Sequence, residues 1–378
     1  MPKRTTAEIK VPHRTYVHAL VKRCPDLTIK KARILEHDRS QYVTPTTLND
    51  FFDKLQGLFE VGDYSPSMIC NFDETMIQCA SRRLTVVGPR TSKTLYIPEQ
   101  AEMPHITLGV AIFADCSYPE SLVIYPRKTL PQEVTAEWLV RYRKICYTGQ
   151  PKGWITAEIL EKYLLEIVLP YFLVQRVRIG SSHRGLLLVD GHASRINAKL
   201  WQSFRDNDID VITFVSHASH VMQPLDLCPF SVFKAQLRQG VSVMRKMTLP
   251  ERRQFVMTHA FDALHIALSP SNIAAGFRKA GVVPLDRAVP LSHSAVNRDP
   301  NTPPRPIRKR KTTINLNGDI LTSQDSLQKI KNDQANTAAR KAKVVKRGRK
   351  TTKKADEETP YDQMEEETDD YSEYSDDA

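Results

Sequence analysis

The stretch Leu186–Arg195, LLLVDGHASR, decides the fold together with Ser219–Asp226, SHVMQPLD. The first four residues of the earlier stretch are apolar, which is typical of a strand buried on both faces of a sheet. This strand ends at Asp190, and open α/β sheets bind their ligands at the carboxyl ends of such strands. The later stretch ends in QPLD, so that Asp226 stands just before a helical pattern.

A third carboxylate ends another apolar segment, Ser67–Asp73, with the sequence SMICNFD. Hard cations such as Mg²⁺ or Mn²⁺ select carboxylate oxygens as ligands. Asp73, Asp190 and Asp226, each at the end of an element, therefore predict a site for divalent cations. Glu74 adjoins Asp73 but alternates to the other face of the strand, so it is left out of the predicted ligand set.

These motifs resemble a known family. NFDET at 71–75, LLLVDGH at 186–192 and SHVMQPLD at 219–226 are similar to the DDE superfamily endonuclease domain of pogo/Tigger-type transposases. Host proteins derived from such transposases, jerky and centromere protein B among them, carry the same domain. GWIT at 153–156 and AGVVP at 280–284 resemble two further elements of this family. The resemblance covers roughly residues 16 to 285, and it departs from the family at Arg195 and Cys228.

The order of elements predicts an α/β domain with an RNase H-like mixed five-stranded sheet flanked by helices. The first three strands are followed by alternating helices and strands, and the last strand is followed by the helix near Asp226. Expected strands cover residues 67–73, 105–114, 121–125, 186–189 and 210–215. Expected helices cover residues 157–173, 196–205, 250–268 and 271–280. This order is expected to bring the three aspartates together although they span more than 150 residues of the chain.

The chemistry of phosphodiester cleavage explains why three carboxylates would be needed. Two divalent ions can activate a water or a 3′-hydroxyl and neutralise the leaving oxygen. In this arrangement Asp73 is expected to bridge two Mg²⁺ or Mn²⁺ ions, and Asp190 and Asp226 each to complete the shell of one. His192, His217 and His220 are expected to be structural or to orient the carboxylates rather than to bind zinc.

The chain before the predicted strands has helical patterns. Residues 1–60 are interpreted as a remnant of a helix-turn-helix DNA-binding region plus a linker helix, capped at Thr44 with Pro45 in its first position. Relative to the family the chain is expected to be truncated at its N-terminus. The endonuclease domain is assigned to residues 61–285. The basic loop 81–104 either guides a phosphate backbone or is an ordinary exposed loop.

Charge is distributed unevenly along the chain. The net charge is +11. Residues 303–354 carry +13, residues 356–378 carry −12, and residues 1–302 carry the remaining +10. Few aromatic or branched apolar residues accompany these charges, so residues 286–378 are expected to be a disordered tail, basic and then acidic. A basic body and a basic tail both favour a polyanionic partner.

The basic clusters suggest DNA contact and entry into the nucleus. The residues expected to contact DNA without sequence preference are Arg308, Lys309, Arg310, Lys311, Lys346, Arg347, Arg349 and Lys350. The expected partners are DNA, a second copy of the chain on DNA, and chromatin proteins. No apolar run approaches the ~20 residues that cross a bilayer, so no membrane partner is expected.

Two functions remain open at this point. One is metal-dependent cleavage and transfer of DNA strands by a transposase-derived enzyme. The other is noncatalytic binding of DNA or chromatin in the nucleus by a domesticated protein that keeps the fold. The six cysteines form no CxxC pair, which argues against a zinc finger or a redox site.

Overall fold

The computed structural model describes the chain over most of the expected domain. The described residues are 43–77, 105–126, 140–180, 183–191, 198–215, 218–240, 247–293 and 318–355, together with the single residues 19, 23, 296 and 316. The expected helix-turn-helix remnant before residue 43, the basic loop 81–104, His192, His217 and the cluster Arg308–Lys311 lie outside the described residues.

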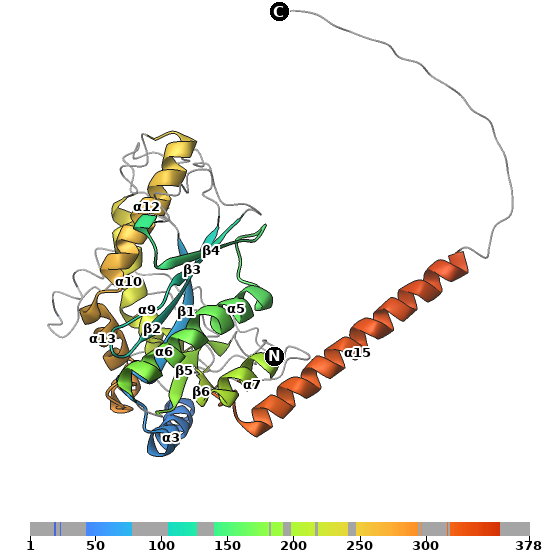
Figure 1. Ribbon diagram of the computed structural model, residues 1–378, viewed down its shortest axis with the longest axis horizontal. Coiled ribbons are helices and arrows are strands. Elements are labelled where there is room, and N and C mark those ends of the chain that lie inside the picture. The colour runs from blue at the N-terminus through green and yellow to red at the C-terminus, as the bar shows by residue number, and fades with distance from the viewer. Residues whose placement is uncertain are drawn as a thin grey trace, which may run out of the picture.

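A mixed six-stranded sheet forms the centre of the molecule, with strand order β4-β3-β2-β1-β5-β6 (Figure 1). The strands are β1 Ile69–Ile77, β2 Ile106–Phe113, β3 Ser121–Tyr125, β4 Ile145–Gly149, β5 Gly185–Val189 and β6 Ile209–Thr213. The neighbours β1–β2 and β2–β3 are antiparallel, whereas β1–β5, β5–β6 and β3–β4 are parallel. The RNase H-like mixed sheet is therefore confirmed, with one strand more than expected.

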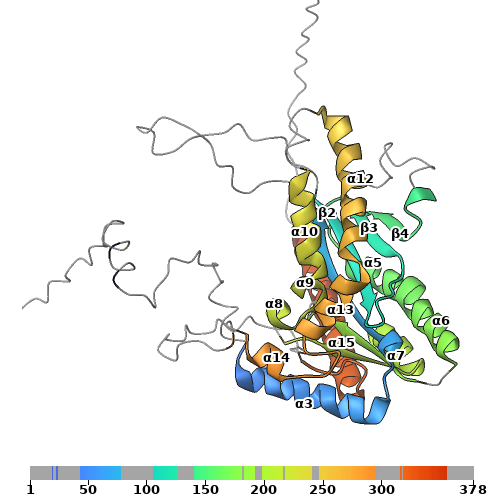
Figure 2. The same cartoon turned by 90° about the vertical axis from the view of Figure 1, so that its left-hand side faces the viewer.

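Helices cover both faces of this sheet (Figures 1 and 2). One face packs against α3, α8, α9, α10, α12 and α13, and the other against α5, α6 and α7. The helices of the first face are α3 Pro45–Gly62, α8 Ser219–Met222, α9 Pro224–Leu227, α10 Pro229–Gln239, α12 Leu249–Ala267 and α13 Pro270–Lys279. Those of the second face are α5 Ala157–Tyr163, α6 Leu169–Ile179 and α7 Ala198–Asp206.

The capping signals read from the sequence are present in the structure. Thr44 caps α3 in a capping box with Thr47, and Pro45 occupies the first helical position. The stripe of α3 that contains Phe51 and Phe52 is buried, as its spacing predicts. Thr156 caps α5 by accepting a hydrogen bond from the backbone N–H of Ile159.

The helix expected over 157–173 runs further and contains an irregular turn. A π-helical turn, η2 Leu164–Val168, joins α5 to α6, and α6 ends at Gly180 with φ of 60°. Pro170 is the second residue after this turn and has no N–H to donate, and π-helical turns occur mostly as single turns within α-helices. The amphipathic pattern predicts the helix, but it does not show the wider turn.

The C-terminal segment differs from the expectation of a disordered tail. Residues 318–321 lie along the outer edge of β6, where Ile320 forms an antiparallel bridge with Ile212. Leu321 donates its backbone N–H to the carbonyl oxygen of Val211. The side chain of Leu321 is fully buried. Helix α15, Gln324–Ala355, then begins on the body and extends away from it (Figure 1). A few well-placed apolar residues therefore order a segment whose overall composition is polar.

Candidate functional site

The central pair of parallel strands places two of the three predicted carboxylates side by side. Asn71 of β1 pairs with Leu188 of β5. Two residues further along each strand lie Asp73 and Asp190, so they come level on neighbouring strands, which are typically ~4.8 Å apart. Because side chains alternate along a strand, both carboxylates stand on the face that also packs against α9 and α10.

The segment that carries the third carboxylate, Asp226, is attached to β1 and β5 by hydrogen bonds of the Asn71 side chain, which is fully buried. The Asn71 amide nitrogen donates to the Leu188 carbonyl at 3.1 Å, and its oxygen accepts from the Leu225 N–H at 3.1 Å. Leu225 directly precedes Asp226 in the short helix α9. One side chain on β1 therefore joins the three segments that carry the predicted ligands.

A second buried amide strengthens the same junction. Gln223 is fully buried, and its side-chain nitrogen donates to the Phe72 carbonyl on β1 at 3.4 Å. Gln223 and Pro224 are the first two residues of the QPLD motif. Each residue type in the motif therefore has a structural reason. Gln223 attaches the segment to β1, Pro224 is the first residue of α9, and Asp226 is the third residue of α9.

The three predicted carboxylates influence one another electrostatically. Burial raises the pKa of Asp73 well above its usual range, and the negative charges of Asp226 and Asp190 raise it further. Burial also raises the pKa of Glu74 to about 7, with the charge of Asp190 as the second cause. Several negative charges near one another stabilise a bound cation, and the cation in turn reduces the repulsion between the carboxylates.

The donor set fits a hard divalent cation, although the side chains are not drawn together around one point. Within the described part of the chain, no group of three or more His, Cys, Asp or Glu side chains is arranged closely enough to hold a metal ion. All three predicted ligands supply oxygen, which is the donor that Mg²⁺ and Mn²⁺ prefer.

Lys234 and Asn71 have no role in the sequence analysis, whereas His220 is expected there to be structural or to orient a carboxylate. The ammonium of Lys234 on α10 lies 4.0 Å from the Asp226 carboxylate, and both side chains are partly exposed. The ring of His220 lies edge-on to that of His293, with centroids 6.1 Å apart. Asn71 stands inside the quoted NFDET motif, but its role depends on contacts with segments more than 100 residues away, which no spacing reveals.

The predicted DNA contacts of the tail are only partly placed. Lys346, Arg347, Arg349 and Lys350 lie on the backbone of helix α15. Within the described residues, no helix has both the length and the apolar character that crossing a membrane requires.

Comparison with known proteins gives three kinds of similarity. Residues 109–277 match the family model of the DDE superfamily endonuclease. A curated protein called MFS-type transporter clz9, from Cochliobolus lunatus, is 30% identical over 141 residues, which is 37% of this chain and 15% of that protein. The chain thus spans about 15% of the length of the curated relative it matches.

Several solved structures are similar to this chain at low sequence identity. The Mos1 mariner paired end complex with Mn has a TM-score of 0.44 and 13% identity, over 70% of this chain and 67% of that chain. The same complex with Mg has a TM-score of 0.43 and 12% identity, over 73% of this chain and 69% of that one. Asp190 and Asp226 lie inside the range of the family match and Asp73 lies before it. The resemblance seen in the motifs is confirmed by that match: residues 109–277 are similar to the DDE superfamily endonuclease.

Proposed function

We propose that this chain cleaves and joins DNA strands with divalent metal ions held by Asp73, Asp190 and Asp226. The observation that carries the proposal is the junction at Asn71, which joins the segments β1, β5 and α9 that carry the three carboxylates. The family match to an endonuclease domain and the Mn and Mg in the names of the similar structures support the same chemistry.

The chain's own residues divide the task. Asp73, Asp190 and Asp226 would hold the ions, and Asn71 and Gln223 fix the backbone from which these ligands project. Bound divalent ions supply an activated water or 3′-hydroxyl and a counter-charge for the leaving oxygen. The raised pKa of Asp73 fits this role, because a bound cation favours the ionised form of a buried carboxylate.

DNA is the proposed partner because of charge. Residues 1–302 carry +10 and residues 303–354 carry +13. Helix α15 carries Lys346, Arg347, Arg349 and Lys350 away from the body (Figure 1). Its length of 32 residues corresponds to roughly 48 Å at 1.5 Å per residue. We place the protein in the nucleus on the strength of the same basic clusters, with assembly on DNA and contact with chromatin proteins as further expectations.

Nicking of supercoiled plasmid by the purified full-length chain tests the proposal. Open-circular product should appear with Mn²⁺ or Mg²⁺ and be absent in EDTA. Asp226→Asn should abolish nicking, whereas Asp50→Asn, an exposed aspartate of α3, should leave it unchanged. If folded wild-type protein binds the plasmid but nicks it with neither metal, the chain acts as a DNA-binding protein without this chemistry.

A further inference from the structure

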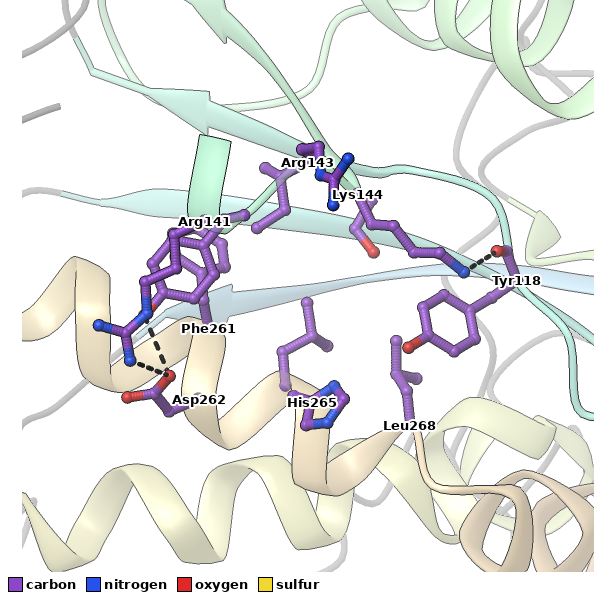
Figure 3. Close-up of a pocket in the computed structure, with 12 residues that line it drawn as sticks. Tyr118, Arg141, Arg143, Lys144, Phe261, Asp262, His265 and Leu268 are labelled. Atoms are coloured by element: carbon purple, nitrogen blue, oxygen red, sulfur yellow. Dashed lines mark hydrogen bonds and ion pairs between the residues drawn. The ribbon is translucent and has the colours of Figure 1, made fainter. Parts of the chain in front are cut away.

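A second site lies toward the β4 edge of the sheet, on the same face as Asp73, between strands β3 and β4 and helix α12 (Figure 3). The pocket has a volume of about 450 Å³, within the range of ~300–1,000 Å³ that is typical of small-ligand sites. Arg143 and Lys144 stand on one side of the opening, and His265 and Leu268 of the α12 end stand on the other (Figure 3). The apolar lining residues Ile145, Phe261 and Leu264 are here called the floor of the pocket.

The charges of this pocket are unbalanced. Arg141, Arg143 and Lys144 line it together with His265, against the single carboxylate of Asp262. Asp262 is already engaged, since it accepts a hydrogen bond from the Tyr142 hydroxyl at 3.0 Å and lies 3.8 Å from Arg141. The pocket therefore keeps an excess of positive charge that its own carboxylate does not neutralise.

Two of the cations differ in how they are held. The Lys144 ammonium lies 4.2 Å from the centre of the Tyr118 ring and donates to the Tyr118 carbonyl at 3.3 Å (Figure 3). Arg143 makes no hydrogen bond or ion pair with any residue that the structure describes. A guanidinium that faces a pocket without such a partner offers parallel N–H donors to an oxyanion, and phosphate is the group that this fork fits best.

The position of the pocket relates it to the carboxylates. Asp73 pairs with Val110, and Gly109 pairs with Leu122, so Val110 comes level with Ser121, which in turn pairs with Ile145. Ser121 and Ile145 line the pocket. Asp73 and the pocket thus share one row of the sheet, three strand spacings or roughly 14 Å apart. Helix α12 and the α9 segment pack on the same face of the sheet.

We propose that this pocket binds one nucleotide of a DNA strand, with its phosphate against Arg143, Lys144 and His265 and its apolar part on the Phe261 floor. The proposal rests on the proposed function for the choice of DNA. The cations select the phosphate, and the volume and the apolar floor select a group larger than a bare phosphate ion. Because the pocket lies away from the carboxylates, it contributes to DNA affinity and not to cleavage.

Binding of a fluorescein-labelled DNA duplex to the full-length protein in EDTA tests this assignment separately from cleavage. Arg143→Glu should weaken binding about tenfold at low salt, and the slope of log K against log salt should fall by about 1 for the lost phosphate contact. Asp262→Asn should tighten binding by about threefold, because the remaining negative charge of the pocket is removed. Arg205→Glu, an equal charge change at an exposed position of α7, should change neither quantity.

The proposal is overturned if Arg143→Glu and Arg205→Glu alter DNA affinity equally, or if Asp262→Asn weakens binding. Tighter DNA binding in Arg143→Glu would also overturn it, and would indicate that the acidic residues 356–378 occupy the pocket instead. Equal melting temperatures for both variants exclude misfolding, since surface substitutions typically change stability by less than ~0.5 kcal/mol. Absence of metal-dependent nicking would defeat the proposed function and leave these binding results unaffected.

Discussion

The side-chain amide of Asn71 connects the three segments that carry the predicted metal ligands. Its two hydrogen bonds, to Leu188 and Leu225, are both 3.1 Å long and lie in a region without solvent access. A buried backbone group that loses its partner costs about 1–3 kcal/mol. Asn71 therefore stabilises the folded protein and also positions the backbone next to Asp190 and Asp226.

Replacement of Asn71 by Ala should lower the free energy of unfolding by roughly 2–4 kcal/mol, because a buried N–H and a buried carbonyl each lose a partner. Urea denaturation measures this change. Gln328→Ala, which removes one exposed hydrogen bond to Asn332, should stay within ~0.5 kcal/mol of the wild type. Equal effects of the two substitutions would show that Asn71 does not support the junction.

The pKa of Glu74 predicts a pH dependence of stability. Its pKa is raised to about 7 by burial and by the charge of Asp190, whereas in the unfolded chain it is ~4.3. The folded state thus holds the proton more tightly, so the wild type loses stability as the pH rises from ~4.3 to about 7. Above about pH 7, Glu74 is ionised in both the folded and the unfolded state, so the loss of stability stays at its full value.

Glu74→Gln removes this penalty and should raise the melting temperature at pH 8 in EDTA by roughly 3–6 °C, corresponding to ~1–2 kcal/mol. At pH 4 the difference should vanish. Glu60→Gln, an exposed position on α3, should follow the wild-type curve at every pH. Parallel curves for wild type and Glu74→Gln would contradict the assignment.

At the scale of elements, the sequence predicts what local patterns determine. The apolar run before Asp190 and the stripe at Phe51 and Phe52 are patterns within one element, and both elements lie where they were expected. The strand expected over 67–73 is present, but β1 begins at Ile69 and runs four residues past Asp73 to Ile77, so Asp73 lies inside the strand and not at its end. The strand β4 was missed because its five residues are half-buried or exposed and so show no apolar pattern. The role of Asn71 could not be predicted, because its partners come from two distant segments.

The C-terminal segment was misjudged for a similar reason. Composition predicts no core for residues 286–378, but the few apolar residues present are those that pack. Leu316, Leu321, Leu327 and Ile330 are all buried. Covering the edge of β6 also removes a row of unpaired backbone groups, which would otherwise be open to other chains.

Ile330→Ala should destabilise the protein by roughly 2–4 kcal/mol, because it opens a cavity where α15 packs near α7. Thermal unfolding at constant salt measures the change. Lys329→Ala, one position earlier and exposed on the same helix, should have little effect. If both variants melt with the wild type, the helix is not attached to the body in solution.

At the scale of the whole molecule, α15 extends a basic helix beyond the sheet (Figure 1). Replacement of Lys346, Arg347, Arg349 and Lys350 by Ala should lower the salt slope of DNA binding by up to about 3–4, because up to four phosphate contacts are lost. The melting temperature should not change, since these residues lie far from the core. An unchanged slope would exclude the helix from the DNA interface.

The central claim is that three carboxylates brought together by the fold hold divalent ions. The most direct measurement is the melting temperature of the full-length protein with Mn²⁺ and in EDTA, for the wild type, Asp190→Asn and Asp50→Asn. A ligand at a hundredfold excess over its dissociation constant stabilises the native state by about 2.7 kcal/mol, or roughly 5–10 °C for a domain of this size.

Mn²⁺ should therefore raise the melting temperature of the wild type and of Asp50→Asn, and Asp190→Asn should lose most of this rise. In EDTA, Asp190→Asn should melt at or above the wild-type temperature, because one source of repulsion is removed. A wild type that does not respond to Mn²⁺, or an Asp190→Asn variant that responds as strongly as the wild type, would contradict the account.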